Sequence, residues 1–512
     1  MSRKRGLKKI NWWEAVGFGV LMIITILVRV VGLEEIPWGL HGDEAWTGLD
    51  AWEIVQGKKV PIYTGHALGQ PTGPLYITAL VFKILGPSIM SLRLSMALFG
   101  IASVGIFYWV LREFFEWRVA WLGTLGMSLS LYHLHYSRLG FMMISALLFQ
   151  SLALGLYFKF LSKQNNWWLI SSAAFVGLGV YSYNSFLFFA GVMVGVVGLM
   201  SWLGKDSIKK GLMFGLVTLI VALPLVRIII FQPDFYFSHY RLYSVWRQKE
   251  FQLLESKKEK IGYVVKTGLK NIKQFYFGGK LDYSDGFGAK YTFNFWVLSL
   301  AGWGLFYVIK TLVIKRGNKV LWFMVISFAI LHLSFFSYID AVYRRGNFLV
   351  FYIFWFYAWG LAYWFKKWDE QIIKQVGLVS LVIIMGLGNG IFYFRNLMTD
   401  RRLELVFIPN MVEVGKKVSR LSLGESDKIW FYSNSHSCKY ETFRFLTGDH
   451  NCTDLSREFG KGNKPDFKSG DVVVVLGSYL TDRDLDKKLS KESRGKITVN
   501  KKGQLLGVVY KL

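Results

Sequence analysis

The chain has 512 residues, of which 53% are hydrophobic and 17% aromatic, while only 19% are charged. A soluble enzyme carries about 25% charged residues, the apolar content excludes a disordered chain, and two cysteines are too few for a disulfide scaffold. The composition therefore predicts a polytopic membrane protein. The net charge of +27 comes largely from basic residues between apolar runs. No nucleic-acid partner is expected, because the membrane explains that charge.

Eleven apolar runs follow one another along the first 394 residues. The first, residues 13–33, is too long for a signal peptide and has no small-residue cleavage site behind it, so we predict a spanning helix. Several runs are shorter than the roughly 20 residues that a perpendicular helix needs. The ten later runs are 92–111, 119–132, 141–161, 167–183, 186–202, 211–231, 291–314, 320–337, 348–365 and 376–394.

The segment 73–86 decides the topology. As a helix it is only about 20 Å long, whereas the hydrocarbon core is about 30 Å thick. If it does not span, the basic clusters between the runs all face the cytoplasm, as the positive-inside rule requires. We therefore predict a multi-pass plasma-membrane protein of about eleven spanning helices with a cytoplasmic N-terminus, and residues 73–86 in or dipping into the outer leaflet. The clusters are Arg112 and Arg118; Lys159 and Lys163; Lys205, Lys209 and Lys210; Lys310, Lys315, Arg316 and Lys319; and Lys366, Lys367 and Lys374.

This topology places the loops 34–90 and 232–290 outside the membrane, together with the tail 395–512. We divide the chain into a transmembrane domain, 1–394, and a soluble extracytoplasmic α/β domain, 395–512. Continuous apolar stretches in the tail predict buried strands, and two short strands around a glycine predict a hairpin. The predicted elements are strands at 428–432 and 471–477, a helix at 481–493 and a hairpin at 496–512.

Both cysteines, Cys438 and Cys452, lie in the tail. An extracytoplasmic compartment is oxidising and permits a disulfide, so we predict that the two are joined. The alternative is a pair of free, buried thiols.

Asp43 and Glu44 are adjacent carboxylates directly outside the first span. One interpretation makes Asp43 the N-cap of a helix. A cap does not explain why a second carboxylate, Glu44, follows directly, nor why the pair lies at the membrane surface. We therefore favour a catalytic role for Asp43 and take Glu44 as the second candidate. A carboxylate at a helix N-terminus is stabilised as the anion and can accept a proton from a hydroxyl. The helix is expected to be amphipathic and to lie in the interface, with Ala45, Trp46, Leu49 and Trp52 on its apolar face and Thr47, Asp50 and Glu53 elsewhere.

Several basic side chains lie near the outer ends of apolar runs, where charges usually face a cavity or a partner. Arginine suits a phosphate because of its fork of donors, whereas the simpler interpretation is snorkelling to the interface. We predict donor-phosphate contacts for Lys83, Arg93, Arg138, Arg344 and Arg345.

With these residues the chain resembles the C-type (GT-C) superfamily of membrane glycosyltransferases, and more narrowly the protein O-mannosyltransferase and aminoarabinose-transferase group. The resemblance rests on the pair Asp43-Glu44, a Pro-containing motif from Gln70 to Tyr76, and Arg93-Leu94, with further family positions at 136–138 and 343–345. It departs from the family at Gln70, where the motif usually begins with His-Pro-Pro, and after Arg138, where no acidic residue follows within several positions.

The resemblance implies an inverting glycosyltransferase that moves a sugar from a polyprenyl-phosphate donor to an acceptor lipid, glycan or protein on the outer face of the cell envelope. Asp43 deprotonates the acceptor hydroxyl, the arginines and Lys83 stabilise the leaving phosphate, and His41, Gln70 and Tyr76 line the substrate cavity. The partners are the donor, an acceptor left unidentified, and the lipid bilayer. No cofactor is predicted, and a divalent metal is left open as an alternative.

Two other functions stay open. A polysaccharide polymerase or ligase would use an oligosaccharide donor and rely on outer-loop arginines without Asp43. A transporter would show internal repeats and interrupted helices in matching halves.

Overall fold

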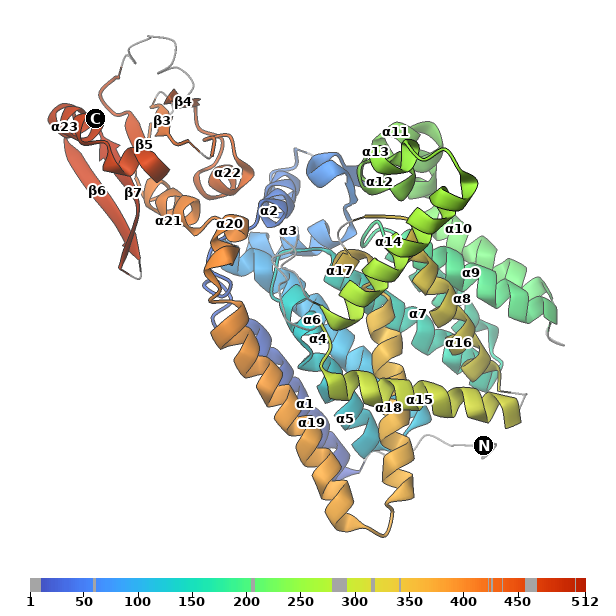
Figure 1. Ribbon diagram of the computed structural model, residues 1–512. Coiled ribbons are helices and arrows are strands. Elements are labelled where there is room, and N and C mark those ends of the chain that lie inside the picture. Colours follow the sequence, from blue (N-terminus) through green and yellow to red (C-terminus); the bar gives the residue numbers. More distant parts are fainter. Residues whose placement is uncertain are drawn as a thin grey trace. The chain divides into compact units, whose positions relative to one another are not determined.

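The computed structural model describes residues 11–58, 61–203, 208–278, 292–314, 318–339, 342–421, 423–424, 427–434, 436–455, 467–501 and 503–512. Lys205, Lys315 and Arg316 of the predicted cytoplasmic clusters lie outside these residues, as do 279–290 of the second outer loop. The chain divides into two compact units (Figure 1). Unit 1 consists of Met1–Val31, Val60–Ile77 and Arg93–Leu397, and unit 2 of Gly32–Lys59, Thr78–Leu92 and Met398–Leu512.

Unit 1 is built mainly from helices, and each of the eleven apolar runs contains one. Eight helices among the described residues are long and apolar enough to cross a membrane, so the chain is a multi-pass membrane protein. The helices α5, α8 and α18 do not meet that criterion, and the number of spans stays a prediction. The eleven are α1 (Trp12–Val30), α4 (Ile89–Phe114), α5 (Trp117–Ser128), α7 (Met143–Lys163), α8 (Asn166–Gly179), α9 (Phe186–Leu203), α10 (Ile208–Phe231), α15 (Phe295–Ile314), α16 (Lys319–Leu331), α18 (Leu349–Lys367) and α19 (Ile372–Phe392).

The first half of helix α18 is enclosed, because every residue from Leu349 to Ala358 is buried. It packs closely on α15 through glycines. A Cβ on Gly304 would lie 1.9 Å from the carbonyl oxygen of Phe356, and one on Gly360 would lie 2.1 Å from that of Leu300. Small residues that let two backbones approach are typical of helix contacts in membranes. Burial against protein also explains why α18 can be less apolar than a lipid-facing helix.

The segments between these helices contain short elements and one long helix. Helix α14 (Lys257–Phe277) lies in the segment 232–290 and was not predicted, because its apolar residues form no continuous run. Its start carries a capping box, in which Ser256 accepts from the Lys258 amide and Glu259 accepts from the Ser256 amide. The short elements are β1 (Tyr63–Thr64), β2 (Gln70–Pro71), α3 (Gly73–Leu85, shared between the units), α6 (Leu131–Tyr136), α11 (Pro233–Tyr236), α12 (Ser238–Tyr243), α13 (Lys249–Gln252) and α17 (Val342–Arg345).

Unit 2 contains a five-stranded sheet in the order β4-β3-β5-β7-β6 (Figure 1). The strands β4, β3 and β5 are parallel, and β7 runs antiparallel to both β5 and β6. The predicted strands, hairpin and helix of the tail are confirmed, whereas β4 was not predicted. The elements are β3 (Ile429–Tyr432), β4 (Cys452–Asp454), β5 (Val472–Val475), β6 (Gly495–Lys501), β7 (Gln504–Lys511), α20 (Glu404–Phe407), α21 (Pro409–Val418), α22 (Glu441–Thr447) and α23 (Arg483–Glu492).

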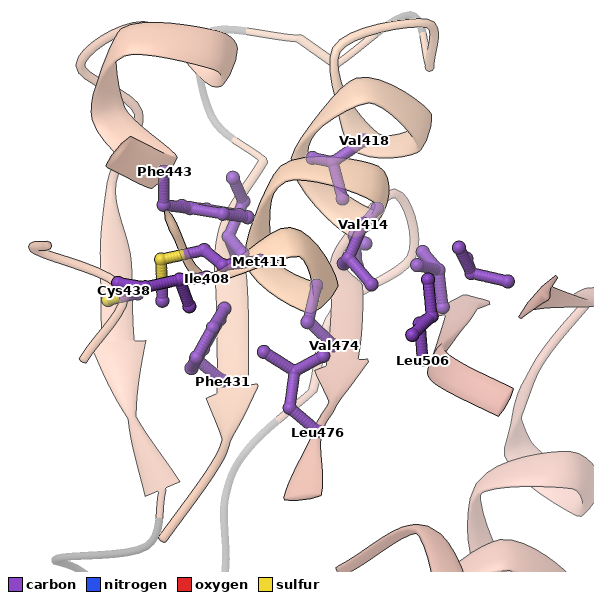
Figure 2. Packing of buried hydrophobic residues seen from close by; sticks show 14 residues of the cluster. Ile408, Met411, Val414, Val418, Phe431, Cys438, Phe443, Val474, Leu476 and Leu506 are labelled. Atoms are coloured by element: carbon purple, nitrogen blue, oxygen red, sulfur yellow. The ribbon is translucent and has the colours of Figure 1, made fainter. Parts of the chain in front are cut away.

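Both faces of this sheet are buried, which explains the continuous apolar runs of its central strands. Alternate residues belong to two hydrophobic clusters. Ile429 and Phe431 pack with residues of α21 and α22 on one face (Figure 2). Trp430 and Tyr432 belong to the cluster that contains Leu485 and Leu489 of α23 on the other face. The tail therefore has the α/β architecture that its sequence predicted.

Cys438 and Cys452 are joined by a disulfide, with their Cα atoms 6.2 Å apart. Asp454 reinforces the same connection, because its carboxylate accepts from the Ser437 hydroxyl (2.6 Å) and from the Cys438 amide (2.8 Å). The segment that leads into α22 is thereby tied to β4.

Unit 2 is larger than the predicted tail domain, because two segments of the first outer loop pack with the tail. Helix α2 (Gly42–Val55) and the C-terminal part of α3 share a cluster with α21 and α22. The buried members are Leu40, Ala45, Ala51, Ala79, Phe82, Ile89, Leu92 and Val412, with Phe445 and Leu446 packed against them. The predicted boundary at residue 395 lies close to the observed one at Met398, but the apolar faces of α2 and α3 are covered by the tail.

Candidate functional site

The first turn of α2 carries the two predicted catalytic carboxylates. The N-cap of the helix is His41, whose Nδ1 accepts a hydrogen bond from the Asp43 amide (2.9 Å). Glu44 Oε1 accepts from the His41 amide (3.2 Å). Together they form a capping box in which histidine takes the place of the usual Ser or Thr. The interpretation of Asp43 as the cap is therefore wrong.

Asp43 and Glu44 differ in what surrounds them. Glu44 is fully buried, and its carboxylate is used in the cap. Asp43 is half-buried, and the capping of α2 does not require its carboxylate. A carboxylate in the first turn of a helix is stabilised as the anion. Of the two, only Asp43 is partly exposed, whereas Glu44 is buried and takes part in the cap.

Residues of the tail lie against this first turn. A Cβ on Gly42 would lie 2.3 Å from Glu441 Oε1 and 3.1 Å from Tyr440 Oη, so only glycine at this position allows the approach. Just before the helix, the Leu40 amide donates to the Phe407 carbonyl (2.6 Å), and Thr442 Oγ1 donates to the Leu40 carbonyl (3.3 Å). The tail therefore fixes the start of α2 on both sides of His41.

The electrostatic surroundings of Asp43 are acidic on the side of α22. Burial raises the pKa of Glu441, the negative charge of Asp43 raises it further, and Arg444 acts in the opposite direction. Burial, with the charges of Glu441 and Asp43, raises the pKa of Tyr440 to about 12. Two carboxylates and a phenol thus share one small region of unit 2.

The expected amphipathic interfacial helix is corrected in one respect. Thr47 and Asp50, which we expected away from the apolar face, are buried with 2% and 5% of their surface exposed. Helix α2 is enclosed by unit 2 on more than its apolar face, because α22 and α3 pack around it.

Unit 1 holds the predicted arginines. Arg93 and Arg138 are both fully buried, and Arg138 lies within electrostatic range of Arg93 and of a third buried arginine, Arg29. Arg138 donates to the Val28 carbonyl (2.8 Å) and lies over the Phe394 ring at 4.9 Å. Arg138 interacts electrostatically with each of the other two, and a buried group of guanidinium forks suits an anion, so this cluster is a candidate anion-binding site.

Arg29 belongs to this cluster but was missed in the sequence analysis. Its guanidinium donates to the Thr25 carbonyl (3.0 Å) and the Ser128 carbonyl (2.9 Å), and contacts His133 Nδ1 at 2.8 Å. The signal that could have found it is the arginine inside the first apolar run, since an ionisable residue within a span is a functional candidate by default.

The remaining predicted residues are placed as follows. Arg344 lies over the Phe141 ring at 4.4 Å, and Arg345 lies over the rings of Tyr338 and Tyr243 at 4.4 and 5.2 Å, in cation–π contacts. Gln70 is buried on β2, and the Tyr76 hydroxyl donates to the Pro61 carbonyl (2.9 Å). Lys83 is exposed on α3.

The structure thus gathers the predicted residues into two groups. Unit 2 contains His41, Asp43, Glu44 and Lys83, and unit 1 contains Gln70, Tyr76, Arg93, Arg138, Arg344 and Arg345. Tyr440 and Glu441 were missed because nothing in a linear sequence links them to residues near its beginning. Within the described part of the chain, no group of three or more His, Cys, Asp or Glu side chains could hold a metal ion.

The chain is similar to known membrane glycosyltransferases in one family model and in several solved structures. Residues 69–230 match the family model described as dolichyl-phosphate-mannose-protein mannosyltransferase. No curated protein sequence matches the chain.

Among solved structures, ArnT from Cupriavidus metallidurans bound to undecaprenyl phosphate is similar over 97% of this chain and 98% of its own, with a TM-score of 0.58 and 13% identity. Its apo form gives a TM-score of 0.57 and 14% identity over the same shares. The apo oligosaccharyltransferase of Archaeoglobus fulgidus is similar over 89% of this chain and 65% of its own, with a TM-score of 0.55 and 14% identity.

Proposed function

We propose that this chain is an inverting glycosyltransferase of the GT-C superfamily of membrane glycosyltransferases. The family match over residues 69–230 and the fold shared with ArnT support this proposal. Its donor is a sugar on a polyprenyl phosphate, and its acceptor is a hydroxyl-bearing molecule at the outer face of the membrane. The undecaprenyl phosphate bound by ArnT, which shares this fold, supports the donor class.

The observation that carries the proposal is the construction of the first turn of α2. His41 and Glu44 supply its cap, and Asp43 keeps a half-exposed carboxylate at the positive end of the helix. In the proposed reaction Asp43 takes the proton of the acceptor hydroxyl as that oxygen attacks the anomeric carbon. The bond to the phosphate oxygen breaks on the opposite face, so the anomeric configuration inverts. The transition state resembles an oxocarbenium ion, as in glycoside hydrolysis.

The leaving group of this reaction is the lipid phosphate, which gains negative charge. The buried cluster of Arg29, Arg93 and Arg138 in unit 1 is suited to bind it, because fixed donors in a site without water stabilise developing charge without reorganisation. Arg344 and Arg345 are held by aromatic rings, which fixes their forks of donors. Lys83 is assigned a weaker part, because its side chain is exposed.

We test the function with purified full-length protein in lipid nanodiscs, undecaprenyl phosphate carrying a radiolabelled hexose or pentose, and isolated cell-envelope membranes as the acceptor. We expect label to leave the donor and appear in an acceptor with inverted anomeric configuration. Transfer of a whole oligosaccharide would favour the polymerase or ligase instead. Failure to bind undecaprenyl phosphate at all would contradict the proposal.

The proposed orientation puts the N-terminus in the cytoplasm and the tail outside. Single cysteines at Lys257 and Lys439, introduced into a chain that keeps the native disulfide, should react with an impermeant maleimide in intact cells, and one at Lys310 should react only after permeabilisation. Protection of the Lys439 position in intact cells would show that 73–86 spans and that the tail lies inside.

A further inference from the structure

Helix α22 presents two side chains to the first turn of α2. The Glu441 carboxylate and the Tyr440 hydroxyl approach the Cα of Gly42 so closely that a Cβ there would lie 2.3 and 3.1 Å from them. Gly42 immediately precedes Asp43, so the Glu441 carboxylate lies beside the residue to which we assign the base. The disulfide between Cys438 and Cys452 and the Asp454 hydrogen bonds fix the segment just before α22.

Stability does not explain why a carboxylate stands at this position. Burial and the charge of Asp43 raise the pKa of Glu441, which means that the folded protein disfavours its ionised form. Arg444, whose charge acts in the opposite direction, donates two hydrogen bonds to Asp449 (2.9 and 2.7 Å). The α22 N-terminus favours the anion, yet the net effect remains unfavourable. Residues kept at such a cost are concentrated at functional sites.

We propose that Glu441 is a positioning residue of the Asp43 site, which acts through Asp43 by forming a carboxylate pair at the start of α2. The inference rests on the proposed function and deepens it, because it makes the tail part of the acceptor-activating site. Two neighbouring carboxylates hold a proton more readily than either does alone. Glu441 thus helps Asp43 to take the proton from the acceptor hydroxyl, and the tail is needed for turnover as well as for folding.

The titratable and charged groups around the pair come from three segments. Helix α2 and its cap contribute His41 and Glu44. The start of α22 contributes Tyr440 and Arg444. The segment before α22 contributes His436, whose ring lies edge-on to Tyr440 at 5.8 Å.

The pairing is tested without any substrate by a double-mutant cycle of thermal unfolding in the full chain at pH 7 and low salt. Because the pKa of Glu441 is raised in the folded state, its ionisation lowers stability as the pH rises through that pKa. We expect Glu441→Gln to raise the Tm, and to raise it less when Asp43 is already Asn. Glu492→Gln, the same change at an exposed position of α23, should be additive with Asp43→Asn. Additivity of Glu441→Gln with Asp43→Asn would overturn the pairing.

The functional role is tested by transfer kinetics with the donor that wild type uses. We expect Glu441→Gln to lower kcat by about 10- to 100-fold, to shift the acidic limb of the pH–rate profile to lower pH, and to be partly rescued by Glu441→Asp. A purely structural role would not move the pH profile. If wild type transfers sugar and Glu441→Gln keeps its rate and profile, the inference fails and the function stands. If the cycle shows coupling but wild type transfers no sugar, the function fails and the carboxylate pair remains.

Discussion

Replacement of Asp43 by Asn is expected to slow sugar transfer by about 10²- to 10⁴-fold, the range for loss of a general base. The amide keeps the size of the side chain but has no basic oxygen to take the acceptor proton. The fold should be unaffected, because the α2 cap is supplied by His41 and Glu44. Turnover is measured as labelled sugar transferred per protein, and folding as the thermal unfolding midpoint of the same preparation.

Glu44→Gln is the control for this experiment. Glutamine serves at the same capping-box position, so this variant should lose far less transfer than Asp43→Asn. Full turnover by Asp43→Asn would rule out the proposed mechanism. Unfolding of Asp43→Asn would show that its carboxylate is structural after all.

The second large effect is expected on donor binding. Arg138→Ala should weaken the binding of undecaprenyl phosphate by about 10- to 100-fold, which corresponds to the loss of a hydrogen bond between charged groups. Arg345→Ala should act in the same direction. Affinity is measured with labelled undecaprenyl phosphate and full-length protein in nanodiscs.

Two further variants keep this prediction testable if Arg138→Ala does not fold. Arg138→Lys retains the positive charge but loses the planar fork, so it should bind the phosphate more weakly than wild type. Arg118→Ala removes an exposed arginine of α5 and should leave affinity unchanged. Unchanged affinity in the Arg138 and Arg345 variants would show that these arginines do not bind the phosphate and serve in snorkelling or packing instead.

The two groups of proposed site residues have different physical origins. The proposed phosphate-binding group consists of arginines buried among helices. Burial raises the free-energy cost of their positive charges, and a bound phosphate would reduce that cost. The base is a half-exposed carboxylate held by a helix terminus and by the tail. The donor needs positive charge for its phosphate, whereas the acceptor needs a base that its hydroxyl can reach.

Most of the fold could be predicted from the sequence alone. Each of the eleven apolar runs coincides with a helix, because hydrophobic length is a local property. The strands β3 and β5 and the β6–β7 hairpin followed from continuous apolar residues and a glycine turn. Asp43, Arg93 and Arg138 were proposed as site residues from the sequence, where Asp43 follows the first apolar run and both arginines lie near the ends of later runs.

The tertiary structure alone decided which side chains meet. One interpretation of the sequence made Asp43 the cap of α2, because histidine is rarely an N-cap, but the folded chain uses His41 and buries Glu44. It also places Glu441 against Gly42, a contact between residues at opposite ends of the chain that no periodicity encodes. Local patterns determine where helices and strands form, because they depend on neighbouring residues; contacts between distant segments depend on how whole apolar faces pack, and those contacts supply the partners of Asp43.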